Sequence, residues 1–175
     1  MTKYVAALAV FALGVALSGL ASGTPQKDTY KLTANLKPRF EVPKPKGVPV
    51  GATGLFTGTA VELANDKARL AWRLTFSKLS GRAVGAHVHK GKAGKAGPVL
   101  VALCGPCRTG QRGRATVSHS QLRTLVNGAA YVNVHTQRNA AGEIRGQLKA
   151  SGGSGSGGTD SETTTTTTTE PSPYP

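Results

Sequence analysis

Aromatic residues are scarce in this chain of 175 residues, at 5% of the total, and Trp72 is the only tryptophan. A fold held together mainly by aromatic packing is therefore not expected. The two cysteines are too few for a small disulfide-dense scaffold. Beyond the first 23 residues no apolar run is long enough to cross a bilayer, so the sequence does not predict a protein with several transmembrane helices.

Acidic residues are also few, since 8 Asp and Glu stand against 22 Lys and Arg, for a net charge of +14. One base, Lys3, lies outside residues 24–150. Three acids also lie outside this range, namely Asp160, Glu162 and Glu170. That central stretch therefore carries a net charge of +16. Such an excess bears on partners and solubility rather than on the fold.

The first 23 residues have the pattern of a secretory signal peptide. Lys3 is followed by an apolar stretch at residues 5–20, and then by the small residues Ala21, Ser22 and Gly23. An uncleaved membrane anchor is the alternative, for which this stretch is short. We expect cleavage after Ala21 or Gly23, which gives a secreted extracellular or periplasmic protein without a transmembrane helix.

Residues 151–175 have the composition of a disordered tail. The segment begins with SGGSGSGG, typical of a flexible spacer, and contains seven consecutive threonines at residues 163–169. It has too few apolar side chains to offset the entropy of an ordered chain. An O-glycosylated extracellular stalk and an inert tail are both consistent with this Ser, Thr and Pro content.

The central residues 24–150 predict one all-β domain. Residues 69–76 alternate strictly, with Leu70, Trp72, Leu74 and Phe76 on one face, which is typical of a half-buried strand. Residues 61–63 precede it across the turn signal Asn65-Asp66, so the two runs predict a hairpin. Further strands are expected at residues 30–36, 54–59, 84–89, 99–103, 113–117, 131–136 and 143–150.

One segment has helical rather than strand periodicity. Residues 120–127 space Leu122, Leu125 and Val126 as on a helix face, with Ser118 or Ser120 as the N-cap and Gly128 as the left-handed residue at the end. A helix of about two turns is too short to change the fold class. The expected architecture is therefore an antiparallel β-sandwich or Greek-key barrel with one short helix near residues 120–127.

Five short motifs, in this order, resemble a known family. They are Glu41-Val42-Pro43, Leu79-Ser80-Gly81, Ala86-His87-Val88-His89, Tyr131-Val132-Asn133-Val134-His135-Thr136 and Gly142-Glu143-Ile144-Arg145-Gly146-Gln147-Leu148. Over residues 30–149 the chain resembles a CHRD domain, the module repeated in the extracellular protein chordin and found alone in secreted bacterial proteins. Ala140-Ala141 departs from the Asn-Pro-Gly-Gly usual in the family before the last motif. The resemblance implies an extracellular β domain without an established enzymatic activity.

Three histidines are predicted to share one face of a sheet. In residues 85–89, Ala86 and Val88 point one way and His87 and His89 the other. In residues 131–135, the valines again oppose His135 and its neighbours. If the valines face the core and the two strands pair, the three imidazoles lie within reach of one another and can bind Zn²⁺ or Cu²⁺ with a position left for water.

Other roles for these histidines remain open. Imidazoles on a sheet face also hydrogen-bond to backbone, or to side chains such as Asn133 and Thr136, and so hold loops in place. General acid–base catalysis is a further alternative, but no Ser, Asp or Cys stands beside them as a nucleophile would. His119, in front of the predicted helix, is expected on the surface.

Cys104 and Cys107 enclose Gly-Pro, as in thioredoxin-like enzymes. That chemistry needs a strand–motif–helix setting, whereas here a glycine-rich basic loop follows at residues 108–113. A local disulfide in an oxidising compartment is the favoured interpretation. A two-cysteine contribution to a metal site is the alternative.

Basic residues cluster in loops rich in glycine and proline, and alternation also leaves Arg69 and Arg73 on a face away from the core. The residues expected to bind polyanions are Lys90, Lys92, Lys95, Arg108, Arg112 and Arg114. Acidic envelope polymers, sulfated glycans or lipid headgroups suit a secreted protein, and scarce aromatic side chains argue against nucleic acid. Solubility, or adaptation to an acidic or salty niche, explains the charge equally well.

Together these observations predict a secreted, monomeric, non-catalytic binding or scaffold module that attaches to anionic extracellular or envelope surfaces. No catalytic residue and no required cofactor are expected. The alternative is a Zn²⁺- or Cu²⁺-binding protein that uses His87, His89 and His135, with Asn133 and Thr136 beside them.

Overall fold

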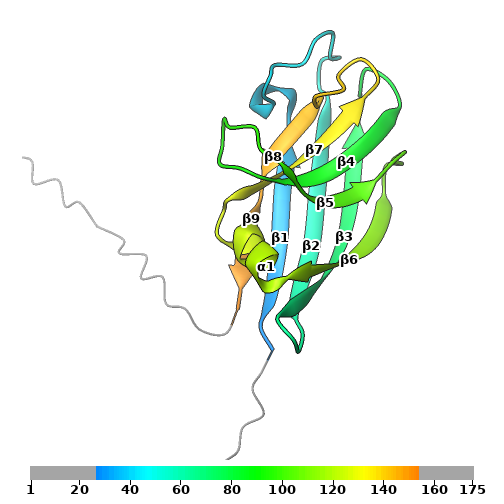
Figure 1. Ribbon diagram of the computed structural model, residues 1–175. Coiled ribbons are helices and arrows are strands. Elements are labelled where there is room, and N and C mark those ends of the chain that lie inside the picture. The colour runs from blue at the N-terminus through cyan, green and yellow to red at the C-terminus, as the bar shows by residue number, and fades with distance from the viewer. Residues whose placement is uncertain (1–26, 154–175) are drawn as a thin grey trace, which may run out of the picture.

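The computed structural model describes residues 27–153, and the predicted signal peptide and nearly all of the predicted tail lie outside them. Two sheets lie one over the other (Figure 1). The five-stranded sheet has the order β6 (Gln111–Ser118), β3 (Lys67–Ser77), β2 (Thr53–Glu62), β1 (Thr29–Leu36) and β9 (Lys149–Gly152). The four-stranded sheet has the order β5 (Val99–Cys104), β4 (Ala83–Lys90), β7 (Ala130–Thr136) and β8 (Ile144–Gln147).

All neighbouring strands are antiparallel, which confirms the predicted all-β sandwich. The predicted hairpin is β2–β3, and Asn65 and Asp66 take the positive φ angles of 63° and 54° that its turn requires. Asn and Asp tolerate this left-handed conformation better than most residues. The runs expected at 54–59 and 61–63 join into the single strand β2.

The single strand expected at residues 143–150 is instead two strands on different sheets. β8 pairs with β7, whereas β9 pairs with β1. Between them the chain crosses from one sheet to the other at Leu148, which is 1% exposed and donates its N–H to Ala130 O at 2.9 Å. β9 includes Ser151 and Gly152, so the sheet extends two residues into the segment assigned to the tail.

The short helix is α1 (His119–Val126), and Ser118 is its N-cap. The Ser118 hydroxyl accepts from the Gln121 N–H, while the Gln121 side chain accepts from the Ser118 N–H, so the two residues form a capping box. Gly128 follows the helix with φ 71°, as predicted. Leu122 and Leu125 face inward, and α1 thereby closes the end of the sandwich beside β1 and β9 (Figure 1).

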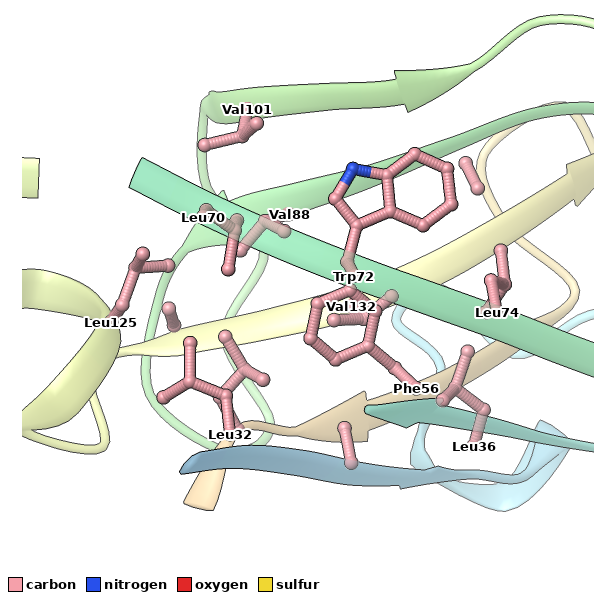
Figure 2. Close-up of a cluster of buried hydrophobic side chains, with 14 of the residues drawn as sticks. Leu32, Leu36, Phe56, Leu70, Trp72, Leu74, Val88, Val101, Leu125 and Val132 are labelled. Atoms are coloured by element: carbon pink, nitrogen blue, oxygen red, sulfur yellow. The ribbon is translucent and has the colours of Figure 1, made fainter. Parts of the chain in front are cut away.

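The core lies between the two sheets (Figure 2). Leu70, Trp72 and Leu74 project from β3 toward Val88 of β4 and Val132 of β7. Full burial of each such side chain contributes roughly 1.5–3 kcal/mol. Because the inner positions of β4 and β7 are committed to this core, the alternate positions of the same strands must face outward. Within residues 27–153 no helix has the length and apolar character needed to cross a membrane.

Candidate metal centre

The histidines lie on β4 and β7, which are neighbours in the middle of the four-stranded sheet. Val88 pairs with Val132 and Ala86 pairs with Val134, and all four side chains are fully buried. The adjacent pairs are His87 with Asn133, His89 with Tyr131, and Gly85 with His135. The predicted arrangement is therefore present: the aliphatic residues face the core, and the three imidazoles lie together on the outer face.

The three rings are close enough to share one small ligand. One ring nitrogen from each of His87, His89 and His135 lies within 4.8 Å of the other two. His87 Nδ1 is 3.0 Å from His135 Nε2. The ring centroids of His87 and His89 are 5.6 Å apart, and those of His87 and His135 are 4.9 Å apart. Each side chain is half-buried, so the cluster remains open to solvent on one side.

Backbone carbonyls orient two of the rings. His89 Nδ1 lies 2.8 Å from Gly97 O, and His135 Nδ1 lies 2.9 Å from Ala140 O. A carbonyl only accepts, so in each neutral ring the proton is on Nδ1 and the lone pair is on Nε2. The Nε2 atom of His89 is buried and has no hydrogen-bond partner among the described residues. This is the arrangement that a metal-ligating imidazole needs.

The surroundings of His87 and His135 lower the pKa of both imidazoles and so favour their neutral forms. Burial lowers the pKa of His87 below its usual value, and the neighbouring His89 lowers it further. Burial is also the largest cause of the lowered pKa of His135, with smaller contributions from His87 and His89 that the hydrogen bond to Ala140 O opposes. Because a proton and a metal ion compete for the same lone pair, neutral rings are prepared to bind metal at neutral pH.

A stack of three side chains supports His89 from behind. The Tyr131 ring lies parallel to the His89 ring, with centroids 5.0 Å apart and an interplanar angle of 5°. On Tyr131, the Arg145 guanidinium carbon sits 3.3 Å from the ring centroid. Arg145 is only 1% exposed, so this cation–π contact is shielded from water and correspondingly strong.

The same stack fixes the loop between β4 and β5 that carries the acceptor for His89. Arg145 Nη2 donates to Lys92 O at 3.0 Å and to Lys95 O at 2.8 Å. The Tyr131 hydroxyl accepts from Gly97 N–H at 3.2 Å. Gly97 O, which orients His89, is therefore held indirectly by Tyr131 and Arg145.

Glu41 completes a buried polar layer on this face. Burial raises the pKa of its carboxyl group, and the Val42 N–H, the charge of Arg145 and the Asn133 amide oppose that rise. Asn133 was expected beside the histidines, and it stands on β7 between His87 and Arg145 of the flanking strands. Sequence reasoning assigned no role to Glu41, Tyr131 or Arg145, although the alternation of β7 already put Tyr131 on the histidine face.

Thr136, the second residue expected beside the histidines, has the other orientation. It shares the inward parity of Val132 and Val134, is fully buried, and donates to Glu143 Oε2 at 2.6 Å. Glu143 also accepts from Ser80 N–H at 2.6 Å and from Asn139 Nδ2 at 3.1 Å. Burial raises the pKa of Glu143, but these hydrogen bonds outweigh it and leave the pKa below its usual value. Thr136 therefore anchors the loop after β7 and makes no hydrogen bond to the imidazoles.

The departure at Ala140-Ala141 does not remove a contact to the site. His135 hydrogen-bonds to the main-chain carbonyl of Ala140, so this contact does not depend on which side chain stands at position 140. Gly142, which follows, has φ 134°, and a Cβ atom there would lie 2.2 Å from Glu41 Oε2. This glycine lets the loop pass directly over the buried carboxylate.

Cys104 and Cys107 lie at disulfide distance, with an S–S separation of 2.11 Å. Cys104 ends β5, and Cys107 N–H donates to Ala83 O at the start of β4. No helix follows the pair, because the chain continues into β6. The setting is that of a local cross-link at the edge of the sheet, and neither sulfur belongs to the histidine cluster.

The basic residues expected to bind polyanions fall in two places. Lys90, Lys92 and Lys95 are exposed at the end of β4 and in the loop beside the histidines. Arg112 and Arg114 are exposed on β6, in the other sheet, and Arg108 precedes that strand. His119 begins α1, where its Nδ1 is 3.9 Å from Glu62 Oε1, and it lies outside the cluster.

A sandwich of two antiparallel sheets, with three imidazoles on the outer face of one, defines an all-β module with a candidate metal centre. The family model for the CHRD domain matches residues 32–148, and the chain belongs to this family. CHRD domains occur in extracellular proteins. Comparison with curated proteins and with solved structures gave no match.

Proposed function

We propose that this CHRD domain binds one transition-metal ion through His87, His89 and His135. The convergence of three ring nitrogens within 4.8 Å carries the proposal. His87 Nδ1 and His135 Nε2 are 3.0 Å apart. This is close to the distance between two nitrogen ligands that bind the same ion at metal–nitrogen distances of 2.0–2.1 Å. The nitrogen–nitrogen distance between adjacent ligands is about 2.9 Å in a tetragonal site and about 3.3 Å in a tetrahedral one.

The ligand set favours Cu²⁺ over Zn²⁺. Three neutral imidazoles suit both ions, and at a given nitrogen site the affinity order places Cu²⁺ above Zn²⁺. Three protein ligands leave a position for water or a small anion on the solvent side. Without metal, the His87 Nδ1–H donates to His135 Nε2 across their 3.0 Å contact. For His87 to bind an ion through Nδ1 as a neutral ring, that proton would move to His87 Nε2.

The test is metal titration of the chelator-stripped protein by calorimetry, with electron paramagnetic resonance for Cu²⁺. We expect one ion per chain, nitrogen hyperfine structure from the imidazoles, and at least a 100-fold loss of affinity in His87→Ala and in His135→Ala. His119→Ala removes an exposed histidine outside the cluster and serves as the matched control. Binding weaker than millimolar, or equal binding by all variants, would contradict the proposal.

A second proposal concerns location and attachment. We infer that the protein is secreted and that its positive charge attaches it to anionic extracellular or envelope surfaces. The signal-like residues 1–23 and the extracellular occurrence of CHRD domains support secretion, and the net charge of +16 over residues 24–150 supports attachment. Fractionation tests secretion directly: the protein should leave the cytoplasm with an N-terminus at Ser22 or Thr24.

A further inference from the structure

The outer face of the five-stranded sheet carries a regular array of cationic side chains. These residues come from strands that are distant in the sequence, so they do not form a single cluster along the chain. Strand pairing aligns three rows across this face, which we name the arginine face. The rows are Thr116–Arg69–Val61–Thr29, Arg114–Ala71–Thr59–Lys31–Ser151 and Arg112–Arg73–Thr57–Thr33–Lys149. They hold six cations, five threonines and no acidic or aromatic residue.

The cations are exposed, and the salt bridge found within the described part of the chain includes none of them. Arg69, Arg73, Arg112 and Arg114 are all solvent-exposed on β3 and β6. The salt bridge seen among residues 27–153, between His119 and Glu62, involves none of the six cations. The positive potential of this face is therefore available to an external anion.

The arrangement has a cost that an anionic partner would remove. Arg73 lies directly opposite Arg112 in the β3–β6 ladder, and like charges at opposed positions destabilise a sheet. Arg114 lies two residues further along β6, roughly 7 Å away. A shallow hollow of about 240 Å³ opens at this point, lined in part by Thr57, Thr59, Arg73 and Arg112. An acidic group seated there would meet two guanidinium groups at once.

The chemistry of the face distinguishes among anionic partners. Guanidinium groups bind sulfate and carboxylate groups through paired hydrogen bonds, and threonine hydroxyls can bond to sugar hydroxyls. The rows contain no aromatic side chain, and Trp72, which also lines the hollow, is only 6% exposed, so the face offers little surface for the stacking on which single-stranded nucleic acid binding depends. Val61 is the only large apolar side chain in the rows, and it is half-buried, so little is offered for insertion into a membrane.

We propose that the arginine face binds a linear acidic polysaccharide that runs along β3 and β6. This rests on the proposed attachment to anionic surfaces, and it specifies both the ligand class and the place. It differs from an attachment through Lys90, at the end of β4 in the other sheet, and through Lys92 and Lys95 in the loop that follows β4. Strand spacing of about 4.8 Å and residue spacing of roughly 7 Å along a strand set the positions of its acidic groups.

The experiment compares two variants of the full chain that each lose three positive charges. One is Arg73→Gln/Arg112→Gln/Arg114→Gln, and the matched control is Lys90→Gln/Lys92→Gln/Lys95→Gln. Binding to heparin and to alginate is measured from roughly 50 to 200 mM salt. We expect the arginine variant to lose at least about 10-fold in affinity and the lysine variant less than about threefold. The slope of log affinity against log salt should fall by about two to three in the arginine variant.

A cooperative thermal unfolding transition in both variants, with a midpoint no lower than that of the wild type, shows that they are folded. Equal losses in the two variants, or a loss confined to the lysine variant, would overturn the arginine face and leave attachment standing. No binding of either polysaccharide by the wild type at low salt would overturn both. Tighter binding to oligo-dT or to anionic vesicles than to heparin would overturn the polysaccharide assignment.

Discussion

At the scale of single residues, the histidine cluster links pH to stability. Burial places the pKa values of His87 and His135 below their unfolded values, so the unfolded chain takes up protons first as pH falls. The stabilisation is fully present above about pH 6.5, and it is lost as pH decreases toward the folded pKa values. A metal ion on the same nitrogens would add to this dependence, because it also competes with protons.

We therefore expect the free energy of unfolding of the metal-free protein to decrease between pH 7 and pH 5. Urea denaturation across this range, with chelator present, measures the slope. His87→Gln/His135→Gln should flatten the profile because its side chains do not titrate, whereas His119→Gln should leave the slope nearly unchanged. A wild-type profile that rises toward acid pH would show that these imidazoles are not held neutral.

Replacing Arg145 should show most clearly how a residue that positions His89, but does not itself bind the metal, affects stability and metal affinity. Arg145→Lys keeps the charge but loses the planar contact with Tyr131 and the paired bonds to Lys92 O and Lys95 O. We expect a loss of about 2–4 kcal/mol in stability, since a buried charge is left with poorer partners. Metal affinity should fall by about 10–100-fold, because Gly97 O no longer holds His89 firmly.

The matched control is Arg138→Lys, because Arg138 is exposed and makes one 3.5 Å contact with Gly47 O. It should stay within about 0.5 kcal/mol of the wild type. Chemical denaturation and Cu²⁺ titration of both variants give the two readouts. Unaltered metal affinity in Arg145→Lys would mean that the stack does not position His89.

At the scale of secondary-structure elements, local periodicity predicted most of what was found. The alternation of residues 69–76 gave β3, and Asn65-Asp66 gave its hairpin, because both signals are contained in adjacent residues. The split into β8 and β9 was not predicted, since the run 143–150 gives no local sign of where the chain changes sheets. That change depends on which strands lie on either side, which is tertiary information.

The same distinction applies to the site. Alternation places the three histidines on one face, and the pairing of β4 with β7 was an assumption that the structure supports. Glu41 and Arg145 are 104 positions apart in the sequence, and the charge of Arg145 acts on Glu41 only because η1 (Pro38–Phe40) and β8 pack together. No local pattern contains that proximity, so the polar layer on the histidine face was not foreseen.

Close packing of β8 against β1 gives a test at this scale. A Cβ atom on Gly146 would lie 2.4 Å from Asn35 O and 2.7 Å from Asn35 C, both backbone atoms of β1. Gly146→Ala must therefore displace a strand, and we expect a loss of about 3 kcal/mol or more. Gly81→Ala is the matched control, because its Cβ would meet nothing within 4 Å. Denaturant midpoints that agree between the two variants would show that β8 and β1 can separate at little cost.

At the scale of the whole molecule, repulsion among the excess positive charges outweighs the attraction of specific ion pairs. The central residues carry a net charge of +16, while the salt bridge seen in the described part of the chain, His119–Glu62 at 3.9 Å, involves no Lys or Arg. Exposed like charges repel one another, and dissolved salt screens that repulsion, with a Debye length of about 10 Å at 0.1 M. Proteins that rely on surface ion pairs respond in the opposite direction, because salt weakens attraction.

We therefore expect the thermal midpoint of the metal-free protein to rise as NaCl increases from roughly 20 to 500 mM, a range that takes the Debye length from tens of ångströms to a few. Calorimetry at constant pH measures the shift. Arg73→Gln/Arg112→Gln/Arg114→Gln should start at a higher midpoint and respond less, because it lacks the opposed Arg73–Arg112 pair. A midpoint that falls with salt would show that attractive contacts, rather than self-repulsion, govern this surface. A low concentration of heparin that raises the wild-type midpoint more than that of the variant would trace the repulsion to the arginine face, because bound anion stabilises only the folded state.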